Sequence, residues 1–150
     1  MKKRQILAVI ILIFTSLSHA QYVIKDRLDL LNLKKVPQEK SYVDHNGPLV
    51  FAGEYLVYSL HCFNAQTNNP TNVSKIGYVA LVNESKKFIF EHKVKLEKGH
   101  GYGDFFVSTE IPSGRYKLLG YTQWMKNSGL SQVFKDDIVI INPYLADQST

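Results

Sequence analysis

The chain has 150 residues, of which 45% are hydrophobic and 21% are charged, and its formal net charge is +5. It contains one cysteine, five prolines and nine glycines. These values fit one ordinary globular domain. They exclude an intrinsically disordered chain, a disulfide-stabilised scaffold and a collagen-like or coiled-coil protein.

Residues 1–20 have the pattern of a secretory signal peptide. Three basic residues follow Met1, an apolar run occupies 6–14, and Ser18 and Ala20 are the small residues that a cleavage site requires. The apolar run is shorter than the roughly 20 residues that a transmembrane helix needs. We therefore expect cleavage after Ala20 and no retained transmembrane segment.

Most of the positive charge belongs to this leader. Its removal takes away three basic residues and no acidic residue, which leaves the mature chain with a net charge of +2. A nearly neutral chain lacks the basic surface with which proteins bind nucleic acid. We therefore expect an exported protein with no nucleic-acid partner.

Residues 21–37 differ in pattern from the rest of the mature chain. Ile24, Leu28 and Leu31 recur at helical spacing between charged residues, and Pro37 would end a helix at this point. The pattern predicts a short amphipathic helix or an irregular leader. Because so short a helix is marginal in water, it either docks on the domain or frays.

From residue 41 the hydrophobic pattern has a period of two, which is typical of β-strands. The alternation is clearest at 88–97, where apolar side chains and His92 alternate with mostly charged ones. The stretches 55–63 and 75–82 are apolar on both faces, as expected for strands near the middle of a sandwich. Further strands are predicted at 41–44, 104–108, 115–125 and 133–141.

Turn residues separate these stretches, and no helical segments of 10–15 residues alternate with them. This pattern argues against a parallel α/β sheet. We predict an all-β fold, an antiparallel β-sandwich of about seven strands of the immunoglobulin or fibronectin type. The glycine-rich segment 99–103 is interpreted as an exposed loop between two strands.

Four segments in this region lie in a recognisable order: 39–44 (EKSYVD), 51–56 (FAGEYL), 74–81 (SKIGYVAL) and 111–125 (IPSGRYKLLGYTQWM). Together they resemble the macroglobulin-like domain of the alpha-2-macroglobulin superfamily, in the version found at the N-terminus of large Gram-negative outer-membrane proteins. The last segment is the most specific. The resemblance covers residues 38–143 and leaves 144–150 as a polar tail.

Such domains often precede a plug-like domain of TonB-dependent receptors. The resemblance therefore implies a non-enzymatic binding or spacer module of the cell envelope, in the periplasm or associated with the outer membrane or cell surface. The implied partner is another envelope protein, such as an outer-membrane TonB-dependent transporter or an assembly complex. Because family members are usually several hundred residues long, the chain is either a stand-alone version or a fragment of a longer precursor.

Local chemistry predicts several details of this sandwich. Gly53 is expected to supply a positive φ before a strand, and the Glu54 carboxylate to accept hydrogen bonds from nearby backbone N–H groups. Tyr116 and Tyr121 are large residues for a thin core, and their hydroxyl groups would need partners when buried.

Cys62 is the only cysteine, so it forms no intrachain disulfide. We interpret it as a small apolar residue in a strand core. His61 precedes it, but adjacent strand residues point to opposite faces, so the two do not make a catalytic dyad.

Residue groups that carry catalysis or bind metals are not evident. No histidine pair has the spacing of a zinc protease, and no second cysteine is present. His92 is interpreted as a half-buried core histidine, and the pairs 44–45 and 136–137 as solvated polar turns. We expect no catalytic residue, cofactor or metal. A hydrolase built around His45 or His92 remains the least favoured hypothesis.

Binding needs only a suitable surface. Tyr102 in the glycine-rich segment, and Tyr121, Trp124 and Met125 further along, are the candidate partner-binding residues. Trp124 has a second interpretation, as a cover for one end of the sandwich. The alternative function is a carbohydrate- or small-ligand-binding sandwich that uses Tyr102, Tyr121 and Trp124.

Overall fold

The computed structural model describes residues 26–28 and 36–145. The chain divides into two units, 1–36 and 37–150, and the fold described below belongs to the second. The predicted signal peptide and most of the predicted leader helix lie outside the described residues. Where the chain is described, no helix is long and apolar enough to cross a membrane.

The second unit is built from β-strands joined mainly by short turns. Its described residues form eight strands and two short 3-10 helices: β1 (Glu39–His45), β2 (Leu49–Phe51), β3 (Tyr55–Asn64), β4 (Ile76–Asn83), β5 (Phe88–Lys95), β6 (His100–Phe106), β7 (Gly114–Thr122), η1 (Trp124–Ser128), η2 (Leu130–Gln132) and β8 (Phe134–Ile141).

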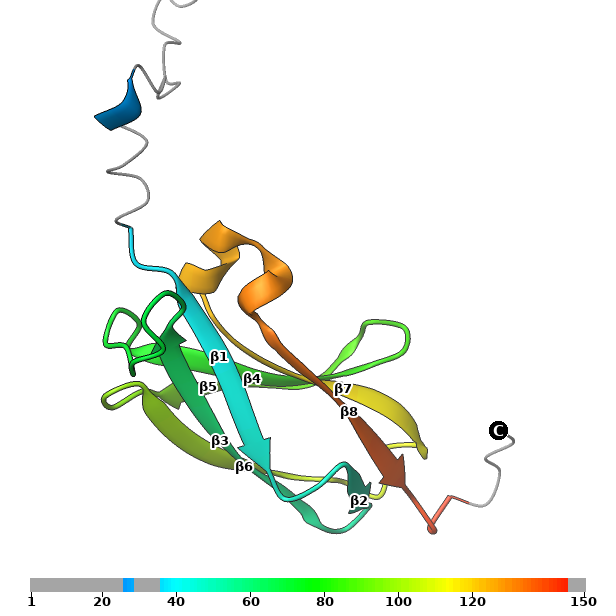
Figure 1. Cartoon of the computed structure of the whole chain (residues 1–150). Helices are drawn as coiled ribbons and strands as arrows, with labels where there is room; N and C mark the ends of the chain where they lie inside the picture. The colour runs from blue at the N-terminus through cyan, green and yellow to red at the C-terminus, as the bar shows by residue number, and fades with distance from the viewer. Residues whose placement is uncertain (1–25, 29–35, 146–150) are drawn as a thin grey trace, which may run out of the picture. The chain divides into compact units, whose positions relative to one another are not determined.

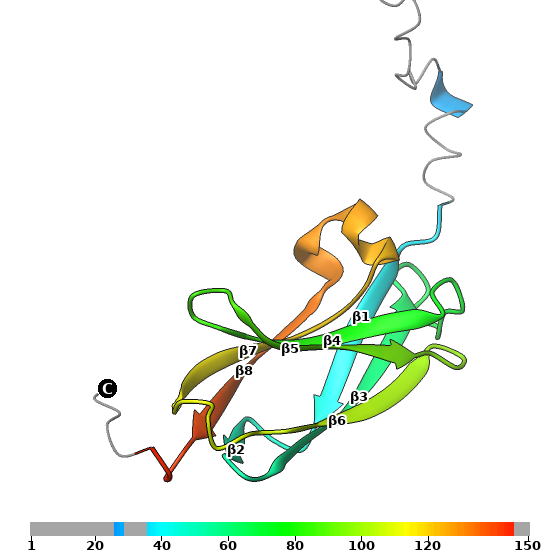
Figure 2. The ribbon, with the colours of Figure 1, turned by 180° about the vertical axis from the view of Figure 1, so that it is seen from behind.

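The strands form two sheets that make the layers of a sandwich (Figures 1 and 2). One sheet has the order β1-β3-β6, and the other has the order β2-β8-β7-β4-β5. Neighbouring strands are antiparallel except β2 and β8, which form a three-residue parallel pair. The predicted all-β sandwich is confirmed. The sequence did not predict β2, because three residues are too few to show an alternating pattern.

The core lies between the sheets and is formed by alternate residues of the strands. In β3 the residues Leu56, Tyr58, Leu60 and Cys62 are buried, while the residues between them are half-buried or exposed. Each fully buried large apolar side chain contributes about 1.5–3 kcal/mol to folding. Further large, fully buried side chains include those of Leu81, Leu118, Met125, Ile138 and Ile140.

The predicted loop at 99–103 is wrong, because this segment forms most of β6. A two-residue turn at Lys98 and Gly99, with φ values of 52° and 83°, reverses the chain after β5. Glu97 and His100 exchange both backbone hydrogen bonds across this turn, at 2.8 and 3.0 Å. Positive φ values at both central residues are characteristic of a type I′ turn, whose backbone twist matches the right-handed twist of the paired strands.

Two glycines in β6 have a packing role. A Cβ atom on Gly101 would lie 2.5 Å from the Lys95 carbonyl oxygen, and one on Gly103 would lie 2.7 Å from the Tyr58 hydroxyl oxygen. Both glycines therefore let β6 approach its neighbours closely. In the sequence they resembled loop residues, because glycine is common in both settings.

The turn before β3 is as predicted. Gly53 has a φ of +93°, in the region that favours glycine. The Glu54 carboxylate accepts a hydrogen bond from the Phe51 backbone N–H at 3.2 Å.

Buried tyrosine hydroxyl groups have partners, as expected. Tyr116 donates to the Pro112 carbonyl oxygen at 2.8 Å. The hydroxyl of Tyr58 lies 2.8 Å from Nδ1 of His92, whose ring also packs against Phe90 and Phe105. The interpretation of His92 as a half-buried core histidine is confirmed.

The predicted strand at 115–125 ends early. β7 stops at Thr122, whose Oγ1 accepts a hydrogen bond from the Met125 backbone N–H at 3.3 Å. The chain then turns into η1 and η2, which lie at the end of the sandwich where β1 begins (Figure 1).

A buried carboxylate joins three segments at this end. Glu39 of β1 is fully buried. It accepts hydrogen bonds from the backbone N–H of Ser74 at 3.0 Å, from the Ser74 hydroxyl at 2.5 Å and from the Thr122 hydroxyl at 2.8 Å. Glu39 thereby ties β1 to the segment before β4 and to the end of β7.

Candidate binding face

Two of the four predicted binding residues are buried. Met125 is fully buried and belongs to the core, so its prediction as a surface anchor is wrong. Tyr121 is 7% exposed, stacks on Tyr78 and donates a hydrogen bond to the Glu91 carboxylate. Burial and this carboxylate raise the pKa of Tyr121. Its aromatic ring is therefore already engaged within the protein.

Trp124 is half-buried at the end of the sandwich. Its indole N–H donates to the Pro37 carbonyl oxygen at 2.7 Å. This contact favours the alternative interpretation of Trp124, a side chain that covers one end of the sandwich.

Tyr102, in contrast to the other three residues, is fully accessible. It points outward from β6, and 87% of its surface is exposed. Tyr102 belongs to the β1-β3-β6 sheet, whereas Tyr121 belongs to the β7 strand of the other sheet. The structure therefore does not bring Tyr102, Tyr121 and Trp124 together into one site.

Tyr102 has aromatic neighbours that the sequence analysis did not select. The strand registers place alternate residues of β1, β3 and β6 on the outer face of their sheet, away from the core. We call this surface the aromatic face. Its aromatic and apolar members are Tyr42, Tyr55, Val57, His61, Phe63, His100, Tyr102 and Phe106, and the polar side chains of Lys40, Asp44, Ser59 and Asp104 lie between them.

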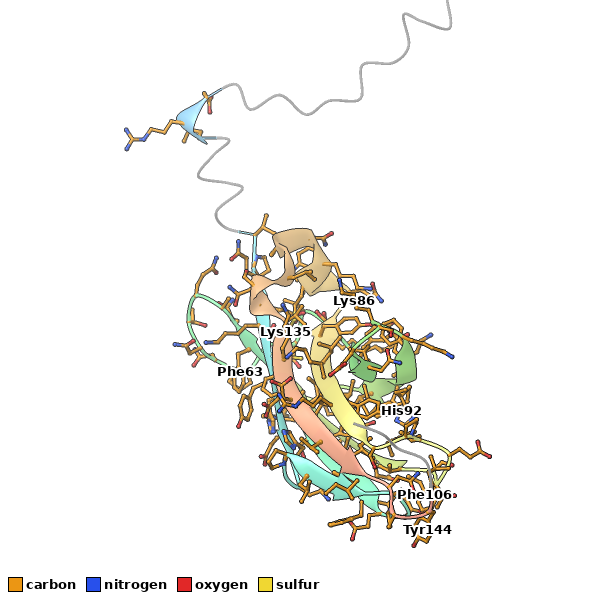
Figure 3. The ribbon with its side chains drawn as sticks, turned by 90° about the vertical axis from the view of Figure 1, so that its right-hand side faces the viewer. Phe63, Lys86, His92, Phe106, Lys135 and Tyr144 are labelled. Atoms are coloured by element: carbon orange, nitrogen blue, oxygen red, sulfur yellow. The ribbon has the colours of Figure 1, made fainter. Side chains whose placement is uncertain are left out.

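Several apolar side chains of this face are largely exposed. Tyr42, Tyr55, Val57 and Phe106 are each about half exposed, with values between 47% and 54%. The Tyr55 and Phe106 rings are cross-strand partners with centroids 5.2 Å apart. Phe63 and Phe106, both labelled in Figure 3, lie at opposite ends of the face.

Sequence reasoning missed this face for a definable reason. Residues 55–63 are apolar on both faces, so the pattern does not tell which set of side chains is covered. The available signal was the series of tyrosines, phenylalanines and histidines at alternate positions in 55–63 and 100–106.

Two histidines lie at one end of the aromatic face. His61 of β3 and His100 of β6 are direct cross-strand partners, and their Nδ1 atoms are 2.8 Å apart. Burial and then the charge of His100 lower the pKa of His61, while the Asp44 carboxylate raises it. Burial and His100 thus disfavour the protonated form of the His61 ring.

A smaller apolar surface lies on the opposite sheet. Leu49 and Phe51 of β2 pair with Val139 and Ile141 of β8, and these four side chains are between 37% and 49% exposed. It has no tyrosine or tryptophan, the residues most enriched at binding hot spots.

The residues considered for catalysis and cation binding are engaged elsewhere. The pairs 44–45 and 136–137 do not form the predicted polar turns, because they lie within β1 and β8. Nε2 of His45 lies 3.0 Å from the Asp136 carboxylate, so one member of each pair contacts the other. Cys62 is buried, and burial followed by the charge of Glu39 raises the pKa of its thiol to about 12. Within residues 26–28 and 36–145, no group of three or more His, Cys, Asp or Glu side chains is placed to hold a metal ion.

The sequence matches no protein-family model and no curated protein. Solved structures do share its fold. The crystal structure of a Salmonella alpha-2-macroglobulin mutant aligns over 69% of this chain with a TM-score of 0.55 and 12% identity. The native conformation of Escherichia coli alpha-2-macroglobulin aligns over 71% with a TM-score of 0.55 and 10% identity.

The aligned part covers only 6% of each macroglobulin chain. The chain therefore spans a small part of the length of these proteins. Because the sequence identity to these structures is only 10–12%, the structural similarity establishes the fold alone. The second unit is a β-sandwich with the fold of a domain of bacterial alpha-2-macroglobulins, and it presents an exposed aromatic face.

Proposed function

We propose that this chain is an exported, non-enzymatic module of the cell envelope that binds another envelope protein through its aromatic face. The partner we favour is an outer-membrane transporter or an assembly complex, since the sequence resembles domains found in that setting. The signal-peptide pattern at 1–20 supports export.

One observation carries the proposal: an aromatic surface lies exposed on a rigid sheet. Tyr42, Tyr55, Tyr102 and Phe106 come from three hydrogen-bonded strands and face the same way. Polar side chains such as Ser59 and Asp104 lie between the aromatic ones, and this mixture of exposed aromatic and polar residues is typical of protein interaction sites. Tyrosine is enriched in protein interfaces, where it contributes contact area with few rotatable bonds.

The edge position of β6 adds to this surface. β6 pairs with β3 on one side and is the last strand of the three-stranded sheet on the other, where the end of β5 lies close to it only near Gly101. A partner that lies across the aromatic face can therefore also reach a strand edge, where backbone groups add directional hydrogen bonds.

Sugar binding is the alternative, because flat aromatic rings also stack on carbohydrate. The structure argues against a sugar site made of Tyr102, Tyr121 and Trp124, because Tyr121 and Trp124 do not lie beside Tyr102. A sugar would have to use the aromatic face itself. The two functions therefore share one surface and differ in the molecule that binds.

Photocrosslinking in the native host tests the proposal. Benzoylphenylalanine replaces one residue in each variant. The test positions are Tyr102 and Tyr55 on the aromatic face, and the matched control positions are Leu49 and Val139 on the opposite sheet. We expect one defined protein adduct from the first pair and not from the second, identified by mass spectrometry. N-terminal sequencing of the cell-envelope fraction should find Gln21 as the first residue.

Two results would contradict protein binding through this face. One is the absence of a defined protein adduct from Tyr102 and Tyr55. The other is the same adduct from the control positions. Binding to a glycan array that is lost in Tyr102→Thr would instead assign the surface to carbohydrate.

A further inference from the structure

His61 and His100 bring two imidazole nitrogens to one point on the aromatic face. Their Nδ1 atoms are 2.8 Å apart, and the rings are nearly perpendicular, at 77°. Both side chains project from the outer face of the sheet, where His100 is exposed and His61 is half-buried. The pair is therefore accessible to small solutes.

The backbone holds this pair firmly. The Cys62 backbone N–H donates to the Gly99 carbonyl at 2.7 Å, which makes His61 and His100 a non-hydrogen-bonded cross-strand pair. In such pairs the Cα atoms lie closest and the side chains approach most tightly. The turn at Lys98 and Gly99 fixes the register next to the pair.

Neighbouring rings limit the movement of His61. The ring of Phe63 stacks on it with centroids 6.4 Å apart, and the ring of Tyr42 lies at the same distance on the neighbouring strand. A ligand whose movement is limited in this way, as that of His61 is, loses little freedom when an ion binds.

The distance between the two nitrogens suits a shared metal ion. Metal–imidazole bonds are about 2.0–2.1 Å long, so two nitrogens at adjacent positions of a tetragonal or tetrahedral ion lie roughly 2.9–3.4 Å apart. The observed 2.8 Å is a few tenths of an ångström shorter, so the two nitrogens move apart and both rings turn until their lone pairs converge on the ion. Without an ion, a single proton shared between the two Nδ1 atoms satisfies the pair.

We propose that His61 and His100 form a binding site for a divalent transition-metal ion, with copper(II) preferred. Both Nδ1 atoms coordinate the ion, and each ring keeps its proton on Nε2. Two protein ligands leave further positions for water or for a donor from a bound molecule. Imidazole selects copper, nickel and zinc over magnesium and calcium, and copper(II) binds most tightly in this series.

The site is independent of the proposed protein partner. Its test therefore uses the purified chain, produced with a tag that contains no histidine. Cu²⁺ binding is measured by calorimetry at pH 7.5, and the ligand atoms are identified by electron paramagnetic resonance. We expect one Cu²⁺ per chain, a nitrogen signature in the spectrum, weaker binding of Ni²⁺ and Zn²⁺, and none of Mg²⁺.

Single variants locate the site. His61→Gln and His100→Gln should each weaken Cu²⁺ binding at least about tenfold, because second-shell changes alone have effects of that size. His45→Gln is the matched control, since His45 pairs with Asp136 and its side chain is only 8% exposed. Binding by the native chain should also weaken below about pH 6.5, where protons compete for imidazole.

Three outcomes would overturn the proposal. They are no stoichiometric Cu²⁺ binding by the native chain, undiminished binding in either His61→Gln or His100→Gln, and an equal loss in folded His45→Gln. Circular dichroism shows that each variant is folded before it is titrated. His61 and His100 lie on the outer face, so both variants should retain the native spectrum.

Discussion

At the scale of single residues, the environment of a side chain decides its chemistry. His61 and His92 are both strand histidines, yet one faces outward beside His100 and the other contacts Tyr58 between the sheets. The sequence predicted the role of His92 because its face is otherwise apolar. It could not predict the His61–His100 pair, because only the β3–β6 register brings these residues together.

The pKa of His61 should respond to its two charged neighbours in opposite directions. Because His100 lowers this pKa, His100→Gln should raise it towards the ordinary value of about 6.5. Because Asp44 raises it, Asp44→Asn should lower it further. NMR titration of the imidazole Hε1 signal measures both shifts, and a reversed direction in either variant would contradict the assignment.

The same group makes the fold sensitive to acid. The folded-state pKa of His61 lies below its unfolded value, so the unfolded chain binds more protons as the pH falls below about 6.5. The stability associated with the neutral His61 side chain is therefore fully present above that pH and is lost as the pH falls below it. The free energy of unfolding is measured by denaturant titration at several pH values for the native chain and for His61→Gln. Below about pH 6.5 it should fall more steeply with decreasing pH in the native chain than in the variant, and above this pH the two should show the same pH dependence.

Cys62 should be inert while the protein is folded. Its thiol is buried, and its pKa of about 12 leaves almost no thiolate at pH 8. We expect no alkylation by iodoacetamide at pH 8 in native buffer and complete alkylation in denaturant, read by mass spectrometry. Rapid labelling of the native protein would show that this thiol is accessible.

At the scale of elements, close backbone approach shapes β6. Gly101→Ala should destabilise the protein by about 1–3 kcal/mol, because the new methyl group meets the Lys95 carbonyl oxygen and the Val94 side chain, each at 2.5 Å. Gly114→Ala is the matched control, since its nearest contact is an ordinary 3.7 Å to Tyr116. Urea denaturation should separate the two, and equal effects would exclude a packing role for Gly101.

The end of the sandwich depends on Glu39. Replacing it with alanine leaves the Ser74 and Thr122 donors without their shared acceptor. We expect a loss of about 2–4 kcal/mol in the free energy of unfolding, because hydrogen bonds to a buried charged group are among the strongest. In Thr122→Val one bond to Glu39 is lost, together with the bond that Thr122 Oγ1 accepts from the Met125 backbone N–H, while both bonds from Ser74 remain, so the loss should be smaller. A loss below 1 kcal/mol in thermal denaturation of Glu39→Ala would contradict this role.

At the scale of the whole molecule, the two faces of the β1-β3-β6 sheet have different tasks. The inner face builds the core, and the outer face is free to bind. Tyr102→Thr should therefore change the free energy of unfolding by less than about 0.5 kcal/mol. Met125→Ala should cost about 2–5 kcal/mol, because Met125 is fully buried. Chemical denaturation distinguishes them, and similar losses would show that Tyr102 is structural.

The sequence by itself determined the type of fold. The period of two in segments such as 88–97, and turn residues such as Gly53, are local signals that need no knowledge of distant contacts. They also predicted the role of His92 and the opposite orientation of His61 and Cys62, since alternation in a strand is a local rule.

Only the tertiary structure decided which apolar side chains are covered. In 55–63 both faces are apolar, and the packing of the second sheet buries Leu56, Tyr58 and Leu60 while Tyr55 and Val57 stay exposed. In the same way, the turn after Thr122 buries Met125, although its neighbour Trp124 is only half-buried. Burial depends on residues far away in sequence, and so the aromatic face and the histidine pair became evident only in the assembled sandwich.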